Sequence, residues 1–234
     1  MKRFYKAVSV AAADDGTLAV HLDGRPVKTP AKNELRLPGE DLARAVAAEW
    51  QEQGEEVDPP SMRLTRLANS AIDRVAANRD HVVGEIAAYA ETDLLCYRAS
   101  EPDQLAARQS AGWDPVLAWL ADSHGIKLEV TEGVLPAAQS GDTIEATLRI
   151  VGGYDDFTLS GLHMATSATG SVVLGLAVAA GRIGGTEAWE LSLIDETWQI
   201  EQWGTDSEAT RRRDGLKAEI EAAAEFLSFC RGQG

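Results

Sequence analysis

The hydrophobic pattern changes its period once along the chain, and this change constrains the fold more than any other feature. In the first forty residues, short runs alternate between apolar and polar side chains, which is typical of strands. Asp15-Gly16 and Asp23-Gly24 separate these runs, and Asp-Gly pairs accept the positive φ angles of tight hairpin turns. The pattern predicts a small antiparallel sheet, with residues 17–22 as a strand and residues 25–29 at an edge, where a proline is tolerated.

Helical spacing replaces the alternation after Pro38. Residues 64–75 carry apolar side chains at intervals of three and four, which predicts an amphipathic helix with one buried stripe. Residues 172–180 are apolar on all sides and are predicted to form a central helix with several neighbours. A short isolated strand is expected at residues 126–130. The other predicted helices cover residues 42–50, 82–89, 105–111, 115–124, 144–151 and 216–230, with a further one from residue 186; the expected N-caps include Asp114, Asp142, Asp155 and Thr186.

The Pro59-Pro60 pair places the expected domain boundary, because consecutive prolines cannot continue a helix and a new apolar pattern begins after them. Residues 1–58 are predicted to form a β-rich N-terminal domain with one helix. Residues 59–234 are predicted to form a larger, mainly helical C-terminal domain. The fold class is therefore α+β.

The charge balance disfavours two classes of partner. The chain has 22 Lys and Arg against 37 Asp and Glu, a formal net charge of −15, which repels nucleic-acid phosphates and anionic lipid surfaces. We expect no nucleic-acid partner and no membrane insertion. The longest apolar run, residues 172–180, is about half the ~20 residues that a spanning helix needs.

Cysteine usage and the N-terminal residues indicate a reducing compartment. Two cysteines, Cys96 and Cys230, are too few for a disulfide framework and lack the spacing of a zinc site. The basic start of the chain is not followed by the apolar core of an export signal. We expect a cytoplasmic protein.

Enzyme motifs are missing from the sequence. It contains neither a phosphate-binding GxxxxGK[ST] loop nor a GxGxxG fingerprint, and its four histidines are scattered. Cys96 with His163 as base is conceivable, but a cysteine in an apolar segment is more often a packing residue. Adjacent Asp195 and Glu196 diverge by about 100° on a helix, which argues against a carboxylate dyad. We therefore expect no catalysis, no cofactor and no metal.

An acidic, tryptophan-bearing stretch over residues 186–208 is the strongest signal for binding. It contains no Lys or Arg but has seven carboxylates and three tryptophans. Trp189 and Trp198, taken singly, are more often core residues than contacts. Glu196 differs, because apolar Leu193 and Ile200 flank it at helical spacing. It is then partly desolvated or beside an exposed apolar patch.

Motifs in one order along nearly the whole chain resemble those of the assembly chaperone family that binds the α subunit of the F-type ATP synthase catalytic head. The matching motifs are Phe4-Tyr5-Lys6, residues 22–30, Glu49-Trp50, Leu64-Thr65, Ala71-Ile72-Asp73, residues 92–98, Arg108-Gln109, Trp113-Asp114-Pro115, Gly170-Ser171, Asp195-Glu196, Gln199, Trp203-Gly204 and Asp206.

The resemblance implies a non-catalytic chaperone that keeps the unassembled α subunit soluble until it joins the β subunit. It implies a β-containing N-terminal domain and a helical C-terminal domain, and a bacterial, cytoplasmic relative of mitochondrial proteins. The free chaperone is expected to be a monomer. Glu196 is the implied contact, with Asp195, Gln199, Glu201 and Trp203 beside it, and the choice between Glu196 and Glu201 stays open.

Two other functions remain as alternatives. One is a small-molecule enzyme with a site between the domains, where Arg25, Lys28 and Arg98 would bind an anion. The other is a generic holdase without a dedicated client. For Glu196, the alternative is a structural pairing inside the helical domain.

Overall fold

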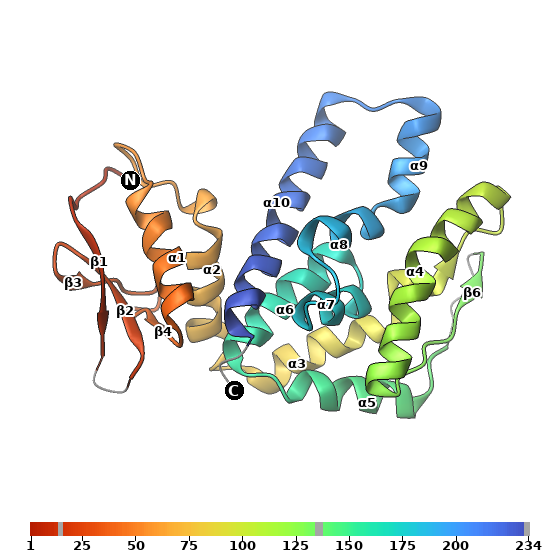
Figure 1. Cartoon of the computed structure of the whole chain (residues 1–234), viewed down its shortest axis with the longest axis horizontal. Coiled ribbons are helices and arrows are strands. Elements are labelled where there is room, and N and C mark those ends of the chain that lie inside the picture. The colour runs from red at the N-terminus through yellow and green to blue at the C-terminus, as the bar shows by residue number, and fades with distance from the viewer. Residues whose placement is uncertain (14–15, 134–137, 232–234) are drawn as a thin grey trace.

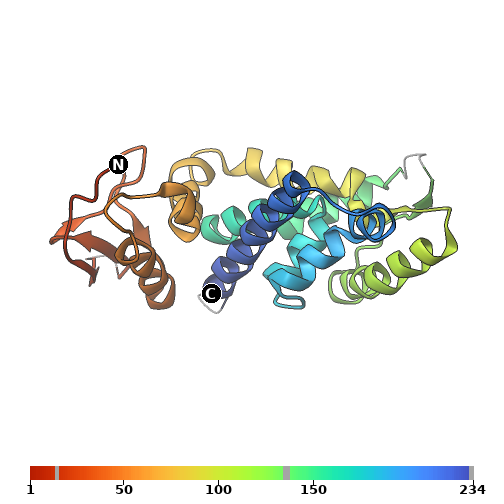
Figure 2. The ribbon, with the colours of Figure 1, turned by 90° about the horizontal axis from the view of Figure 1, so that it is seen from above.

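The N-terminal part of the molecule is a small sheet covered by helix α1. The computed structural model describes residues 1–13, 16–133 and 138–231. Figures 1 and 2 show the sheet and α1 at one end of an elongated molecule, with the other helices extending away from them. The elements of this sheet unit are β1 (Val8–Ala12), β2 (Leu18–Leu22), β3 (Arg25–Pro26), β4 (Arg36–Leu37) and α1 (Glu40–Gln51).

Strand β2 organises the sheet. It pairs antiparallel with β1, from Val8 opposite Leu22 to Ala12 opposite Leu18, and also with β3 and β4. Asp23 and Gly24 both have positive φ angles, 49° and 80°, which confirms the predicted tight turn into the edge strand β3. Asp15, of the other predicted turn, lies outside the described residues.

The helical part begins with α2 and ends with the long α10. Its elements are η1 (Pro59–Ser61), α2 (Arg63–Ser70), the π-helical η2 (Ala71–Val75), α3 (Arg79–Ala88), η3 (Tyr89–Thr92), η4 (Leu94–Cys96), β5 (Tyr97–Arg98), α4 (Asp103–His124), β6 (Thr131–Glu132), α5 (Gly141–Gly152), α6 (Asp156–Thr169), α7 (Val172–Ala179), α8 (Gly185–Ser192), α9 (Ile194–Trp203) and α10 (Ser207–Cys230). A small sheet followed by helices confirms the predicted α+β class. No helix in the described part of the chain is both long and apolar enough to span a membrane.

Two apolar cores meet at α10. The core of the sheet unit also contains Leu64 and Leu67 of α2, and Phe226 of α10. Ile220 and Leu227 of α10 belong instead to the larger helical core. The last helix thus joins both cores, and the domain boundary after residue 58 stays a prediction.

A carboxylate from α1 caps α2. Glu49 accepts hydrogen bonds from the N–H groups of Leu64 (2.8 Å) and Thr65 (2.7 Å) and from the Thr65 hydroxyl (2.7 Å). These backbone donors have no partner within their own helix. Burial raises the pKa of Glu49, so the hydrogen bonds offset part of its desolvation cost.

The predicted helix break before Pro115 and the predicted strand at residues 126–130 are wrong. Residues 105–111 and 115–124 belong to one helix, α4, with Pro115 inside it and not at its start. Buried Gln109, Trp113, Val116 and Leu120 hold the helix on both sides of the proline, and Pro115 itself is exposed to solvent. Residues 126–130 form no strand; the nearest strand is β6, Thr131–Glu132, which is not isolated but pairs parallel with β5.

The predicted helix caps have mixed outcomes. Asp155 accepts from the N–H groups of Phe157 and Thr158, as expected. The predicted cap at Asp142 is wrong, because Ser140 accepts from Thr143 N at 3.1 Å instead. The predicted cap at Thr186 is also wrong, because α8 begins after Gly184 and Thr186 lies inside it.

Helix α7 is the central helix, as predicted: all eight of its residues are buried. The N–H groups of its first turn therefore cannot donate to water. Buried Asp93 lies at this turn and accepts from Ser171 Oγ (2.8 Å) and Val173 N (3.1 Å). Desolvation outweighs these hydrogen bonds and raises the pKa of Asp93 to about 6.

Replacing Gly175 by Ala should destabilise the fold. A Cβ at this position in α7 would lie 2.3 Å from Thr166 Oγ1 of α6 and 3.1 Å from Leu162 Cδ1. Overpacking of this kind costs about 1–3 kcal/mol. Gly84→Ala in α3 is the matched control, because its Cβ would meet nothing within 4 Å. In urea unfolding, the free energy of unfolding of Gly175→Ala should be lower than that of the wild type, and that of Gly84→Ala should be equal or higher. An equal loss of stability in both variants would contradict the close approach of α6 and α7.

Asp93 should impose a pH dependence on stability. Its carboxyl has a higher pKa folded than unfolded, so its contribution is fully present below about pH 4 and is lost as pH rises to about 6. At about 1.4 kcal/mol per pKa unit, the loss is about 3 kcal/mol. Urea unfolding between pH 4 and 7.5 should therefore show the wild type losing stability relative to Asp93→Asn as pH rises. A constant difference between the two proteins would contradict this assignment.

Candidate functional site

The acidic tryptophan stretch folds into α8, α9 and the start of α10. Figure 1 shows α9 standing beside the upper part of α10, with a connection at the top of the view. Gly204, with φ of 82°, follows the last residue of α9, and Asp206 caps α10 by accepting from Glu208 N and Ala209 N. We call residues 199–208, the end of α9 and this connection, the α9–α10 tip.

The side chain of Glu196 extends from α9 toward α10, where it forms ion pairs with two arginines. It pairs with Arg212 and, at 3.4 Å from Oε1 to Nη1, with Arg213. Its side chain is 24% exposed and that of Arg213 only 14%, so the pair is partly shielded from water. Arg213 also donates to Thr197 Oγ1 at 3.0 Å and lies over the Trp189 ring at 5.2 Å. This geometry fits the alternative that Glu196 has a structural pairing.

The neighbouring carboxylates face α4 instead. Glu201 accepts from the Arg108 guanidinium at 2.9–3.0 Å, and Asp195 accepts from Gln109 Nε2 at 2.6 Å. Gln109 is buried, and its Oε1 accepts from Ala99 N, so the amide links α9 to the chain after β5. Helix α9 is thus held on one side by α10 and on the other by α4.

The tryptophans of the stretch have different environments. Trp189 is half-buried, packs against the helical core, and has Arg213 and Lys217 over its ring. Trp198 is half-buried with Arg108 over its ring at 5.8 Å. Trp203 is 79% exposed, the highest value among the large hydrophobic residues of the described chain. It is the end of α9, not its buried face, that offers an aromatic surface.

The structure brings together part of the predicted site. Gln199, Glu201 and Trp203 are exposed near the end of α9, whereas Asp195 and Glu196 are partly buried at its beginning. Sequence reasoning missed the basic partners on α4 and α10. The one available signal was the Arg211-Arg212-Arg213 run that directly follows the acidic stretch.

The residues expected for the two enzymatic alternatives are not brought together in the described part of the chain. Burial, with the nearby Asp93 carboxylate, raises the pKa of the Cys96 thiol to about 12, so this thiol is protonated at neutral pH. His163 Nε2 lies 3.5 Å from Glu85 Oε2, and burial lowers the pKa of this imidazole. Arg98 is buried and pairs with Asp114 in the helical part, away from Arg25 and Lys28 on the sheet unit. In the described residues, no group of three or more His, Cys, Asp or Glu side chains could hold a metal.

Comparison with known proteins decides the family. Residues 2–121 match the ATP12 chaperone protein family. The crystal structure of Atp12 from Paracoccus denitrificans is 42% identical, with 98% of each chain covered and a TM-score of 0.93. This chain belongs to the Atp12 family of ATP synthase assembly chaperones.

Other relatives of the Atp12 family extend the likeness. The solved Atu1473 protein of Agrobacterium tumefaciens is 41% identical, with 97% of this chain and 85% of the other covered and a TM-score of 0.93. The mitochondrial protein atp12 of Schizosaccharomyces pombe is 22% identical over 242 residues, which cover 98% of this chain and 82% of the other.

A double-mutant cycle should show that Glu196 and Arg213 stabilise each other. Because both are largely shielded, Glu196→Ala and Arg213→Ala should couple by about 1–2 kcal/mol in urea unfolding. Glu40 and Arg44 form the control pair, since both are well exposed on α1 and such pairs contribute about 0.3–0.5 kcal/mol. Equal coupling in the two pairs would contradict a structural role of Glu196.

Proposed function

We propose that this Atp12-family protein binds the unassembled α subunit of the F-type ATP synthase catalytic head through the α9–α10 tip, without catalysing a reaction. A ring subunit on its own exposes large apolar interfaces that aggregate unless they are covered. The observation that supports the tip as contact is Trp203, which is 79% exposed. An exposed indole at the end of a helix costs solvation free energy, and tryptophan is enriched among residues that dominate binding.

Charge around Trp203 fits a basic partner surface. Glu201, Asp206 and Glu208 of the tip are exposed. Carboxylates around an aromatic anchor favour encounter with Arg and Lys on the partner and fix its orientation. Glu201 already pairs with Arg108, so a basic side chain of the client would compete with that arginine.

Glu196 has a different role in this proposal. Its ion pairs with Arg212 and Arg213 hold α9 against α10, and this arrangement positions Gln199, Glu201 and Trp203. Asp195 does the same toward α4 through Gln109. We propose contact for the exposed residues and positioning for Asp195 and Glu196.

Likeness to proteins from two bacteria supports a bacterial, cytoplasmic chaperone with mitochondrial relatives. A free monomer is part of the same proposal.

Capture of the α subunit should separate contact from positioning. In co-purification, Trp203→Ser should weaken capture about 30-fold, as expected for a residue contributing about 2 kcal/mol, and leave the melting temperature unchanged because the ring is exposed. Glu196→Lys should weaken capture and also lower the melting temperature, because it places a cation beside two arginines. Leu148→Ser, at a position 37% exposed on α5, is the control for capture and should not weaken it, although loss of its partly buried side chain should lower the melting temperature slightly.

Unchanged capture by Trp203→Ser would remove the tip as the contact. Equal protection of unrelated unfolded proteins by the wild type would instead indicate a generic holdase.

A further inference from the structure

A groove on the sheet unit has a charge opposite to that of the rest of the protein. Residues 1–36 contain seven bases and four acids, whereas the remaining residues contain 15 bases and 33 acids. A groove of about 680 Å³ lies within this basic region, between the start of the chain, the β2–β3 turn and Trp50.

Aromatic and aliphatic side chains form the apolar part of this groove. Phe4 is 64% exposed and meets buried Tyr5 edge-on, with ring centroids 5.3 Å apart. Tyr5 meets Trp50 in the same way at 5.7 Å, and its hydroxyl donates to Trp50 O at 2.7 Å. The Tyr5 ring is therefore held against Trp50 before any ligand arrives. Such an exposed apolar surface favours a partner with apolar side chains.

Arg25 and Lys28 supply the charge of the groove. Both are exposed, line the groove, and form no ion pair with any residue in the described part of the chain. The groove also contains the Asp23 carboxylate, which already accepts from Lys6 N and Ala7 N at 2.9–3.2 Å. Unpaired cations beside an apolar surface complement a ligand that combines carboxylates with apolar groups.

A second groove of about 260 Å³ continues from the first. Met1, Lys28 and Trp50 line both, and Met62 and Asn69 line only the second. The polar atoms Trp50 Nε1 and Asn69 Oδ1 of these lining residues are buried, so they are not part of the open surface of the groove. Because the two grooves share three lining residues, together they fit an extended segment better than a compact ligand.

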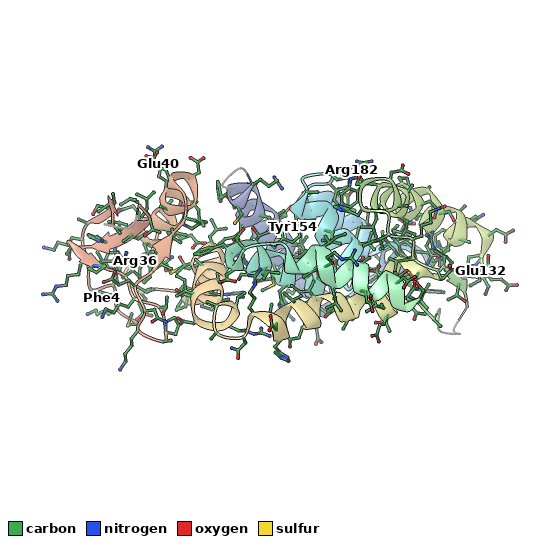
Figure 3. All side chains as sticks on the ribbon, turned by 90° about the horizontal axis from the view of Figure 1, so that it is seen from below. Phe4, Arg36, Glu40, Glu132, Tyr154 and Arg182 are labelled. Atoms are coloured by element: carbon green, nitrogen blue, oxygen red, sulfur yellow. The ribbon has the colours of Figure 1, made fainter. Side chains whose placement is uncertain are left out.

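We propose that this pair of grooves binds an extended, acidic segment of another protein that carries aromatic or aliphatic side chains. The apolar side chains would lie against Phe4 and Trp50, and the carboxylates would pair with Arg25 and Lys28. Figure 3 shows Phe4 at the sheet end of the molecule, and Figure 1 shows α9 and its connection to α10 far from that end. This is a second docking site that prefers acidic segments, whereas the α9–α10 tip suits basic ones.

Peptide binding tests the chemistry of the site. The probe is a fluorescein-labelled peptide in which Glu alternates with Leu and Phe, measured by anisotropy with the full chain. Two matched peptides replace either every Glu by Lys or every Leu and Phe by Ser. The acidic, apolar peptide should bind at least about tenfold more tightly than either, and added salt should weaken it. Equal binding of all three would overturn the proposal.

Variants locate the site. Arg25→Glu combined with Lys28→Glu should weaken the acidic peptide at least about tenfold. The control, Lys127→Glu with Arg182→Glu, changes charge equally at exposed positions in the helical part and should bind like wild type; Figure 3 shows Arg182 there. Phe4→Ser provides a second test and should also weaken binding of the acidic peptide. Its exposed ring can be removed with little loss of core packing.

Other outcomes would overturn the proposal. Loss of peptide binding in Trp203→Ser, with no loss in the groove variants, would show that the peptide binds at the α9–α10 tip. Self-association of the wild type that the Arg25→Glu, Lys28→Glu protein lacks would make a second copy of this chain the occupant. Melting curves show which variants are folded, and if the double variant unfolds, Phe4→Ser decides.

Discussion

The burial of α7 on every side is the constraint on which the helical part depends. Its eight residues have no exposed face, so other helices must surround it and its first-turn N–H groups must find partners inside the protein. Asp93 and Ser171 supply these partners, and Gly175 lets α6 approach closely. A buried carboxylate is costly, yet here it satisfies donors that an apolar residue would leave unpaired.

Helix α10 connects the two cores to the proposed contact surface. One end joins the two cores through Phe226 and Leu227. Toward its other end, Arg212 and Arg213 hold Glu196 of α9. The position of Trp203 is therefore set by a helix anchored in both cores, while the groove at Phe4 depends on the sheet unit.

Much of the fold could be predicted because local chemistry determines it. The Asp23-Gly24 pair required a turn with positive φ angles, and the unbroken apolar run around Gly175 required a central helix. The sequence was misleading at Pro115, since packing on both sides keeps the helix continuous there. Proline statistics describe a backbone preference, which buried neighbours can outweigh.

The candidate site was harder to predict because its contacts are distant in sequence. Glu201 and Arg108 are 93 residues apart, and Glu196 and Arg212 lie on different helices. Periodicity identified Glu196 as unusual, since it shows which side chains share a helix face. It could not show that arginines from another helix occupy that face.

The way α9 is attached has a consequence for how this protein should be studied in solution. Of its ten residues only Ile194 is buried, so polar pairs with α4 and α10 supply much of its attachment. Dissolved ions screen the exposed Glu201–Arg108 pair, whereas the partly shielded pair of Glu196 with Arg213 is screened much less. We therefore expect ionic strength to act on the free chaperone as well as on its complexes, because it weakens the contact of α9 with α4. A salt titration of binding reports both effects unless hydrogen exchange of α9 is followed alongside it.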